Sequence, residues 1–224
     1  MAAKTKTYVW KDPSRLAGVV VVVLAIQIVL STLSLVIGLL LGQASMYAAD
    51  PTVLTPAQTP RLIIDLLGLL LLLVAIATPL WILRVSSNAH SVRPNMEHSV
   101  LGSIGWYLVP LVWFVKPFMA MSEIWEVSAS GGGEVRKGKR KDVVLNWWWG
   151  IFVAGLFVAY AAGSLANQPF GIWVRMFSDV FTIATCLVFM TVVRRISRMQ
   201  IAQRHASVFS DAAAEGPLNM AAAG

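Results

Sequence analysis

Two pairs of opposite charges are the residues best placed to do chemistry within the long apolar runs of this 224-residue chain. Arg61 and Asp65 stand four residues apart at the start of one run, and Arg175 and Asp179 repeat that spacing at the start of another. Residues four apart share a face of a helix, and a charge in hydrocarbon is costly. One interpretation is an ion or proton entry point. The favoured one is a charge cluster at the outer leaflet, with salt bridges that fix the depth and pairing of two helices.

Other reactive residue types are sparse. The single cysteine, Cys186, lies within an apolar run, so a disulfide within the chain or a thiolate metal site is excluded. The spacing of His90 and His98 matches no common set of metal ligands, and both are expected in a solvated loop. The sequence contains no phosphate-binding, esterase or zinc-protease motif. We therefore expect no enzyme, no cofactor and no metal site.

The composition indicates a membrane protein. The chain is 57% hydrophobic and only 13% charged, whereas soluble domains carry about 25% charged residues. Its net charge of +7 could suggest nucleic acid as a partner. Lys and Arg also collect on the cytoplasmic side of membrane proteins, however, and this topological explanation is the stronger one. No nucleic-acid partner is expected.

Four apolar runs meet the length of about 20 residues that a helix needs to cross a bilayer. They predict an all-α membrane protein with spans at about 16–41, 62–83, 143–165 and 170–193. The four-span domain would occupy residues 16–203. A cytoplasmic segment, 1–15, would precede it, and a disordered cytoplasmic tail, 204–224, would follow it.

A further apolar stretch, "IGWYLVPLVWFVKPFMAMSEIWE", lies between the second and third spans and is broken by Pro110 and Pro117. From Ile104 to Val115 a helix would rise only about 18 Å, which is too short to cross. After Pro117, apolar and charged residues fall on different arcs of a helix, as in a helix that lies in the membrane interface. We therefore predict a proline-broken, re-entrant or interfacial amphipathic segment over 104–127.

The distribution of basic residues supports this topology. If segment 104–127 does not cross, all 18 Lys and Arg residues except Arg61 and Arg175 fall on one side of the membrane. The positive-inside rule strongly prefers that arrangement. Both termini are therefore expected in the cytoplasm.

Three further groups of residues are candidates for binding or anchoring. Acidic residues of the interfacial helix could pair with arginines at the span ends, forming a structural clamp or, alternatively, a pocket for a lipid phosphate or small anion; the residues are Arg84, Asn88, Glu123, Glu126, Arg194 and Arg195. Tryptophans are expected to anchor the chain in the headgroup region: Trp81, Trp106, Trp113, Trp125, Trp147, Trp148 and Trp149. A basic run would contact anionic lipid: Arg136, Lys137, Lys139, Arg140 and Lys141.

Three stretches together resemble a bacterial membrane-protein family called domain of unknown function 4328. They are "PLWILRVSSNAH", "GWYLVPLVWFVKPFMAMSEIWEVS" and "VVLNWWWGIFVAG", within about residues 75–195. The matching positions are Trp81, Arg84, Asn88, Ala89, Trp106, Pro110, Pro117, Glu123, Trp125 and Trp147–Trp149. Ser122 departs from the arginine that the family often has before the glutamate. The resemblance implies a bacterial inner-membrane protein and no particular activity.

These patterns favour a non-catalytic scaffold or accessory subunit that binds lipid, a partner membrane protein or further copies of itself. A small oligomeric channel or transporter is the alternative. A pore should show polar residues along a full stripe of a span, and this pattern is not evident in the sequence.

Overall fold

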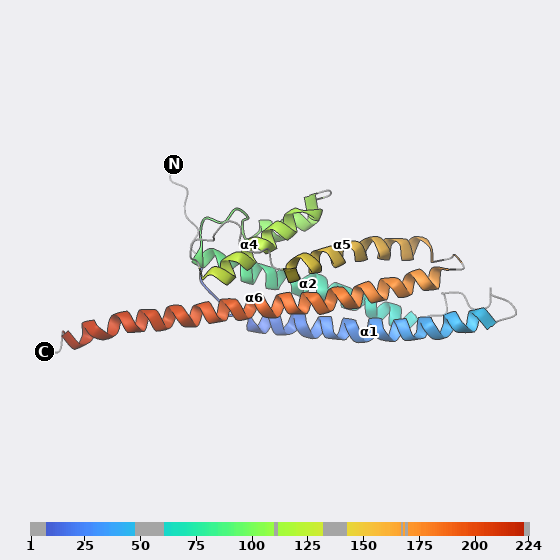
Figure 1. Ribbon diagram of the computed structural model, residues 1–224, viewed down its shortest axis with the longest axis horizontal. Coiled ribbons are helices and arrows are strands. Elements are labelled where there is room, and N and C mark those ends of the chain that lie inside the picture. Colours follow the sequence, from blue (N-terminus) through green and yellow to red (C-terminus); the bar gives the residue numbers. More distant parts are fainter. Residues whose placement is uncertain are drawn as a thin grey trace. The chain divides into compact units, whose positions relative to one another are not determined.

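Four long helices dominate the structure, a computed structural model (Figure 1). It describes residues 8–47, 61–109, 112–131, 143–166, 168 and 170–221; within these ranges, the side chains of 41–47, 61–67, 108 and 211–221 are not described. The four helices are α1 (Ser14–Tyr47), α2 (Arg61–Val92), α5 (Val143–Ser164) and α6 (Gly171–Ala221). Each contains a stretch long and apolar enough to cross a membrane: Ser14–Leu40, Gly68–Val92, Val143–Ser164 and Gly171–Ser210. The chain is a multi-pass membrane protein with four candidate spans, as predicted.

The segment between α2 and α5 is bent into short helical pieces, which confirms the prediction of a broken element there. It runs through α3 (Gly102–Gly105) and two 3₁₀ turns, η2 (Trp106–Leu108) and η3 (Val112–Phe114), into α4 (Lys116–Ser130). Pro117 lies in the first turn of α4, where its missing N–H leaves no intrahelical bond unmade. Gly131, with φ of 64°, ends α4 in the left-handed conformation that glycine adopts without strain.

Helix α1 begins at an aspartate cap. Asp12 accepts hydrogen bonds from the backbone N–H of Ser14 and from its hydroxyl, both at 2.8 Å. These bonds, the backbone one first, hold the pKa of the Asp12 carboxyl below its ordinary value. Asp12 thus fixes where the first span starts.

Two helices extend further than the sequence suggested. Residues 84–92, beyond the predicted end of the second span, continue α2, because Val85 and Ala89 bury one face of this extension. Helix α6 continues to Ala221, where a disordered tail was expected after Gln203. The part of the extension before Gly216 is rich in alanine, which is the best helix former.

The chain divides into two compact units, each with its own core. The first unit comprises the described parts of 1–17, 80–139 and 194–224, and its fully buried side chains include Trp81, Val85, Met121, Ile124 and Ile196.

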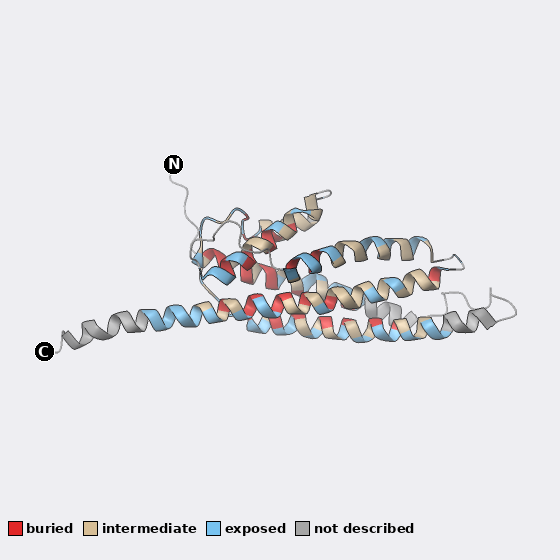
Figure 2. Ribbon diagram, viewed as in Figure 1, coloured by how far each residue is buried: buried red, intermediate tan, exposed pale blue. Residues whose placement is uncertain are grey.

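The second unit comprises the described parts of 18–79 and 140–193. Its helices bury few residues and leave large apolar side chains exposed, among them Leu71, Leu72, Phe157 and Phe177 (Figure 2). Such side chains suit contact with lipid.

Candidate functional site: a buried polar core and a charged groove

A buried pair of amides forms the centre of the first unit. The side chain of Gln200 on α6 donates from Nε2 to the carbonyl of Val85 at 2.9 Å and to the hydroxyl of Ser128 at 3.1 Å. Its Oε1 accepts from Nδ2 of Asn88 at 3.0 Å. Gln200 is 2% exposed and Asn88 is 1% exposed, so these bonds form away from water. One glutamine therefore ties α6 to α2 and α4.

Asn88 extends this network to the segment before α1. Its Oδ1 accepts from the backbone N–H of Lys11 at 2.9 Å, and its Nδ2 donates to the Lys11 carbonyl at 2.8 Å. Nδ2 also serves Gln200, so both of its hydrogens are used. The amide thus holds the N-terminal segment by its backbone.

Further side-chain bonds close the core around this pair. Trp81, fully buried, donates from Nε1 to the hydroxyl of Ser197 at 3.1 Å. Gln203 donates to the carbonyls of Val127 and Ser128, at 2.9 and 2.6 Å. Carbonyls in the last turn of a helix lack intrahelical partners, so Gln203 caps the C-terminus of α4.

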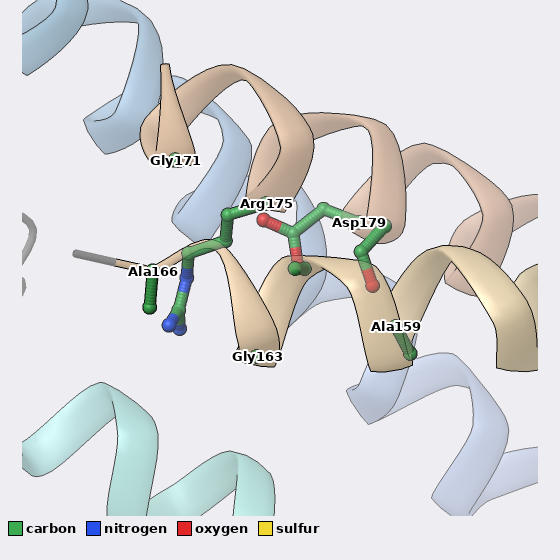
Figure 3. Close-up of a pocket in the computed structure, with 8 residues that line it drawn as sticks. Ala159, Gly163, Ala166, Gly171, Arg175 and Asp179 are labelled. Carbon is green, nitrogen blue, oxygen red and sulfur yellow. The ribbon is translucent and has the colours of Figure 1, made fainter. Parts of the chain in front are cut away.

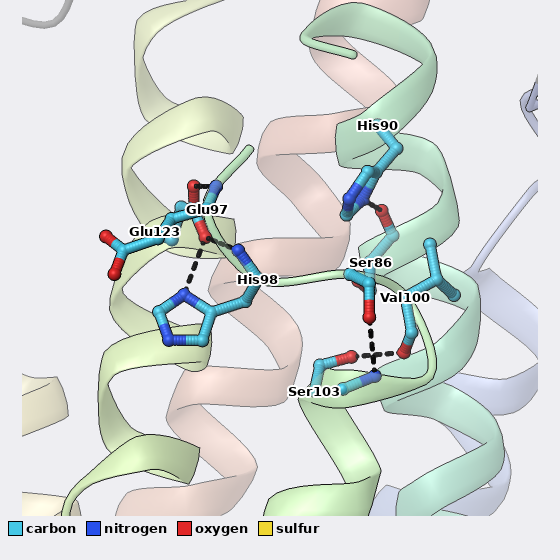
Figure 4. A network of polar contacts seen from close by, with 9 residues as sticks. Ser86, His90, Glu97, His98, Val100, Ser103 and Glu123 are labelled. Carbon is cyan, nitrogen blue, oxygen red and sulfur yellow. Dashed lines mark hydrogen bonds and ion pairs between the residues drawn. The ribbon is translucent and has the colours of Figure 1, made fainter. Parts of the chain in front are cut away.

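Glu123 on α4 anchors the chain that follows α2 (Figure 4). One carboxylate oxygen accepts from the backbone N–H of Glu97, and the other accepts from the backbone N–H of His98 and lies 2.9 Å from its Nδ1. The side chain of His98 is 5% exposed, and its Nε2 is buried without a hydrogen-bond partner. Glu123 therefore orients the imidazole and holds the loop after α2 against α4, which is a structural role.

The expectation that His90 and His98 lie in a solvated loop is wrong for His90, which lies in a helix, and for His98 it is wrong about solvation only. His90 belongs to α2, where Nδ1 lies 2.8 Å from the carbonyl of Ser86 and the ring contacts that of Tyr8. Both histidines are buried because each satisfies one ring nitrogen within the protein. Among the described residues, no group of His, Cys, Asp and Glu could hold a metal ion.

The residues of the predicted clamp take different roles. Glu123 is bound by His98, not by an arginine as predicted, because the loop after α2 brings that histidine against α4. Arg84 donates at 3.4 Å to the carbonyl of Asp12 at the surface. Asn88 belongs to the core, whereas the remaining members, Glu126, Arg194 and Arg195, are exposed.

Gln200 and His98 were missed as buried residues, and Gln203 was missed as the half-buried cap of α4. Gln200 follows Val193, Ile196 and Ser197 at helical spacing, on the face of α6 that the structure buries. That periodicity could have identified it.

Several predicted tryptophan anchors pack within the protein. Trp81, Trp125, Trp148 and Trp149 are buried, and the Trp148 ring stacks on that of Phe189 at 4.9 Å. Trp147 is 64% exposed, as a membrane anchor would be. Trp106 and Trp113 are half-buried, and the Lys116 ammonium lies over the Trp106 ring. Arg136, Lys137, Lys139, Arg140 and Lys141 lie outside the described residues.

The second unit holds Arg175 and Asp179 of the predicted charge cluster, but these two residues do not form the predicted salt bridge. Asp179 on α6 accepts the hydroxyl of Ser34 on α1 at 2.8 Å. Arg175 and Asp179 line a cavity of about 310 Å³ between α5 and α6 (Figure 3). The side chains of Arg61 and Asp65 lie outside the described part of the chain.

A family model described as domain of unknown function (DUF4328) matches residues 46–198, which is more than half of the chain. The chain belongs to this family. The match confirms the resemblance noted above, and it includes Trp81, Asn88 and Glu123, while Lys11 and Gln200 lie outside it. Comparison with curated proteins and with solved structures gave no match.

Proposed function

We propose that this DUF4328 protein is a non-catalytic accessory subunit that holds a partner membrane protein, or a second copy of itself, through its first unit. The observation that carries the proposal is the buried amide network. Gln200 and Asn88 direct both hydrogens of their amide groups to groups of the chain itself. A satisfied buried network favours one rigid arrangement, which suits a scaffold.

The exposed part of α6 offers a surface for that partner. Residues 204–210 are all exposed (Figure 2). Val208 and Phe209 expose 49% and 73% of their surface. Most of the stability of a helix in a protein comes from packing of one of its faces. Because Gln200 and Gln203 fix only the base of this extension, a partner that covers Val208 and Phe209 would stabilise the rest.

The test measures the mass of the complex that the full-length protein forms in mild detergent. We expect a complex larger than one chain, which Val208→Asp combined with Phe209→Asp dissociates while the separated chain stays folded. Ser207→Asp is the matched control, because it adds a charge at an exposed position of the same stretch. A monomeric wild-type protein, or a complex that survives the double change, would contradict the proposal.

A channel or transporter is the second candidate, and one observation favours it. Gln27, Ser31 and Ser34 are buried along one face of α1, and Ser34 bonds Asp179. These residues give α1 part of the polar stripe that a pore requires. The accessory proposal predicts that purified protein in liposomes conducts no ions. An ion flux abolished by Asp179→Asn would favour the channel.

A further inference from the structure

The cavity between α5 and α6 has two chemically different linings. Small residues form one wall: Ala159, Ala162 and Gly163 of α5, and Ala166, which follows it. Arg175 and Asp179 of α6 lie opposite, and both side chains point into the space between the helices (Figure 3). A slot with an apolar wall and charges spaced along the other suits a ligand that has both an apolar chain and a polar end.

Arg175 supplies the positive charge in this cavity, and an anionic ligand would stabilise it. It lies four residues into the candidate span that begins at Gly171, so its Cα is about 6 Å below the start of the helix. Among the described residues, no carboxylate forms an ion pair with its guanidinium. A half-buried cation in this position is stabilised by an anion, and the guanidinium fork matches the geometry of a phosphate.

Asp179, one helical turn after Arg175, can accept a further hydrogen bond from a ligand. Its Oδ2 is committed to the Ser34 hydroxyl at 2.8 Å, which leaves Oδ1 to accept from a ligand. Asp179 lies about 6 Å further along the helix than Arg175, a separation that a glycerol backbone can span. A phospholipid with two acyl chains has esters at that depth and no donor, whereas one with a single chain has a free glycerol hydroxyl.

We propose that this cavity between α5 and α6 binds a single-chain glycerophospholipid. Arg175 binds the phosphate, Asp179 accepts the free glycerol hydroxyl, and the acyl chain lies against Ala159 and Ala162. The order of these groups matches that of a lipid in a bilayer, with the phosphate at the end of the span and the chain deeper. This inference is independent of the accessory role proposed above, because it uses residues of the second unit alone.

The test uses delipidated full-length protein in detergent and measures bound lipid by native mass spectrometry. The probe is oleoyl-lysophosphatidylethanolamine. Dioleoyl-phosphatidylethanolamine lacks the hydroxyl, monoolein lacks the phosphate and glycerol 3-phosphate lacks the chain. We expect one lysolipid per chain, bound about tenfold or more tightly than each control; for the first two controls the factor is that of a lost bond to a charged group, and for glycerol 3-phosphate it is that of lost apolar burial.

Two variants examine the site, each with a matched control. Arg175→Gln should weaken lysolipid binding about tenfold, while Arg198→Gln, an exposed arginine on the same helix, should leave it unchanged. Ala162→Leu should block the slot without altering a charge, while Ser164→Leu adds the same side chain at an exposed position nearby and should have no effect.

Each contrary outcome overturns a defined part of the proposal. Equal binding of monoolein, or lysolipid binding unaffected by both Arg175→Gln and Ala162→Leu, would remove the site. Equal binding of the two-chain lipid would remove the role of the glycerol hydroxyl. Binding of glycerol 3-phosphate as strong as that of the lysolipid would remove the lipid assignment. If Arg175→Gln does not fold, Ala162→Leu and Ser164→Leu still decide between these outcomes.

Discussion

Gln200 and Gln27, both buried in the described part of the chain, should respond differently to the same change. Gln200 is 2% exposed and makes three side-chain hydrogen bonds, to Val85, Ser128 and Asn88. Gln27 is 4% exposed, but its Oε1 has no partner and its Nε2 makes one long bond of 3.3 Å, to Ser31. Leucine has nearly the same size as glutamine and no polar atom, so it removes these interactions while keeping the volume filled.

The magnitudes follow from the bonds lost. A buried hydrogen bond contributes about 1 kcal/mol net, and a partner left unsatisfied adds to the loss. Gln200→Leu removes three bonds, but Val85 and Asn88 each keep other partners, so we expect a loss of about 3 kcal/mol. Gln27→Leu removes one weak bond and also the cost of an unpaired buried oxygen, so we expect a change within about 1 kcal/mol of zero or a gain.

The assay is unfolding of the purified protein in one detergent, followed by tryptophan fluorescence. For a chain of this size, 1 kcal/mol corresponds to a shift in melting temperature of about 2–4 °C, so Gln200→Leu should lower it by roughly 6–12 °C. Gln168→Leu, at an exposed position, serves as the control. Equal losses for Gln200→Leu and Gln27→Leu, or a larger loss at Gln27, would refute this account of the polar core.

Three further predictions concern the chain around this core. Glu123→Gln should destabilise the protein by about 1–3 kcal/mol, because one of the two oxygens becomes an NH2 group and one N–H of the 97–98 segment loses its acceptor; unchanged melting would contradict this. Asp12→Ala should cost about 0.5–2 kcal/mol at neutral pH. Because the pKa of Asp12 is lowered in the folded state, its contribution is present above the ordinary carboxyl pKa and is lost as the pH falls through the folded-state value; melting curves of both proteins across acidic pH would show a constant difference if this is wrong. For topology, single cysteines facing the cytoplasm should resist an impermeant thiol reagent and one in the first loop should react; the protected positions are Ala2, Ser130 and Ser210, and the reactive one is Thr55. Labelling at Ser130 with protection at Ser210 would mean that segment 104–127 crosses.

Apolar run length and proline position were enough to predict most of the fold. The backbone hydrogen bonds of a helix form within one continuous stretch of chain, so each of the four long apolar runs predicted one helix. Pro117 marked the start of α4. The end of α2 was less predictable, because burial of Val85 and Ala89 extends the helix through sequence that reads as polar. The end of α6 was also missed, since its last described side chains, 204–210, are exposed and no apolar run marks them.

The partners of polar side chains could be predicted only in part. Asn88 and Glu123 were identified as important, but their partners lie far along the chain: Lys11 and Gln200 for the first, His98 for the second. Opposite charge suggested arginines for Glu123, whereas the fold supplied two backbone amides and an imidazole. A sequence shows which groups need partners; the path of the loops decides which groups provide them.

The hydrogen bonds between Asn88 and the backbone of Lys11 limit which amino acids each of the two positions can accept. Both bonds are to main-chain atoms, the N–H and the carbonyl. These bonds therefore do not depend on which side chain stands at position 11. Almost any amino acid should be accepted there. Proline is the exception because it lacks the N–H. At position 88, by contrast, an amide of that length is required, since aspartate could not donate and glutamine would reach too far. Among related chains, amino-acid variation should therefore be wide at position 11 and narrow at position 88.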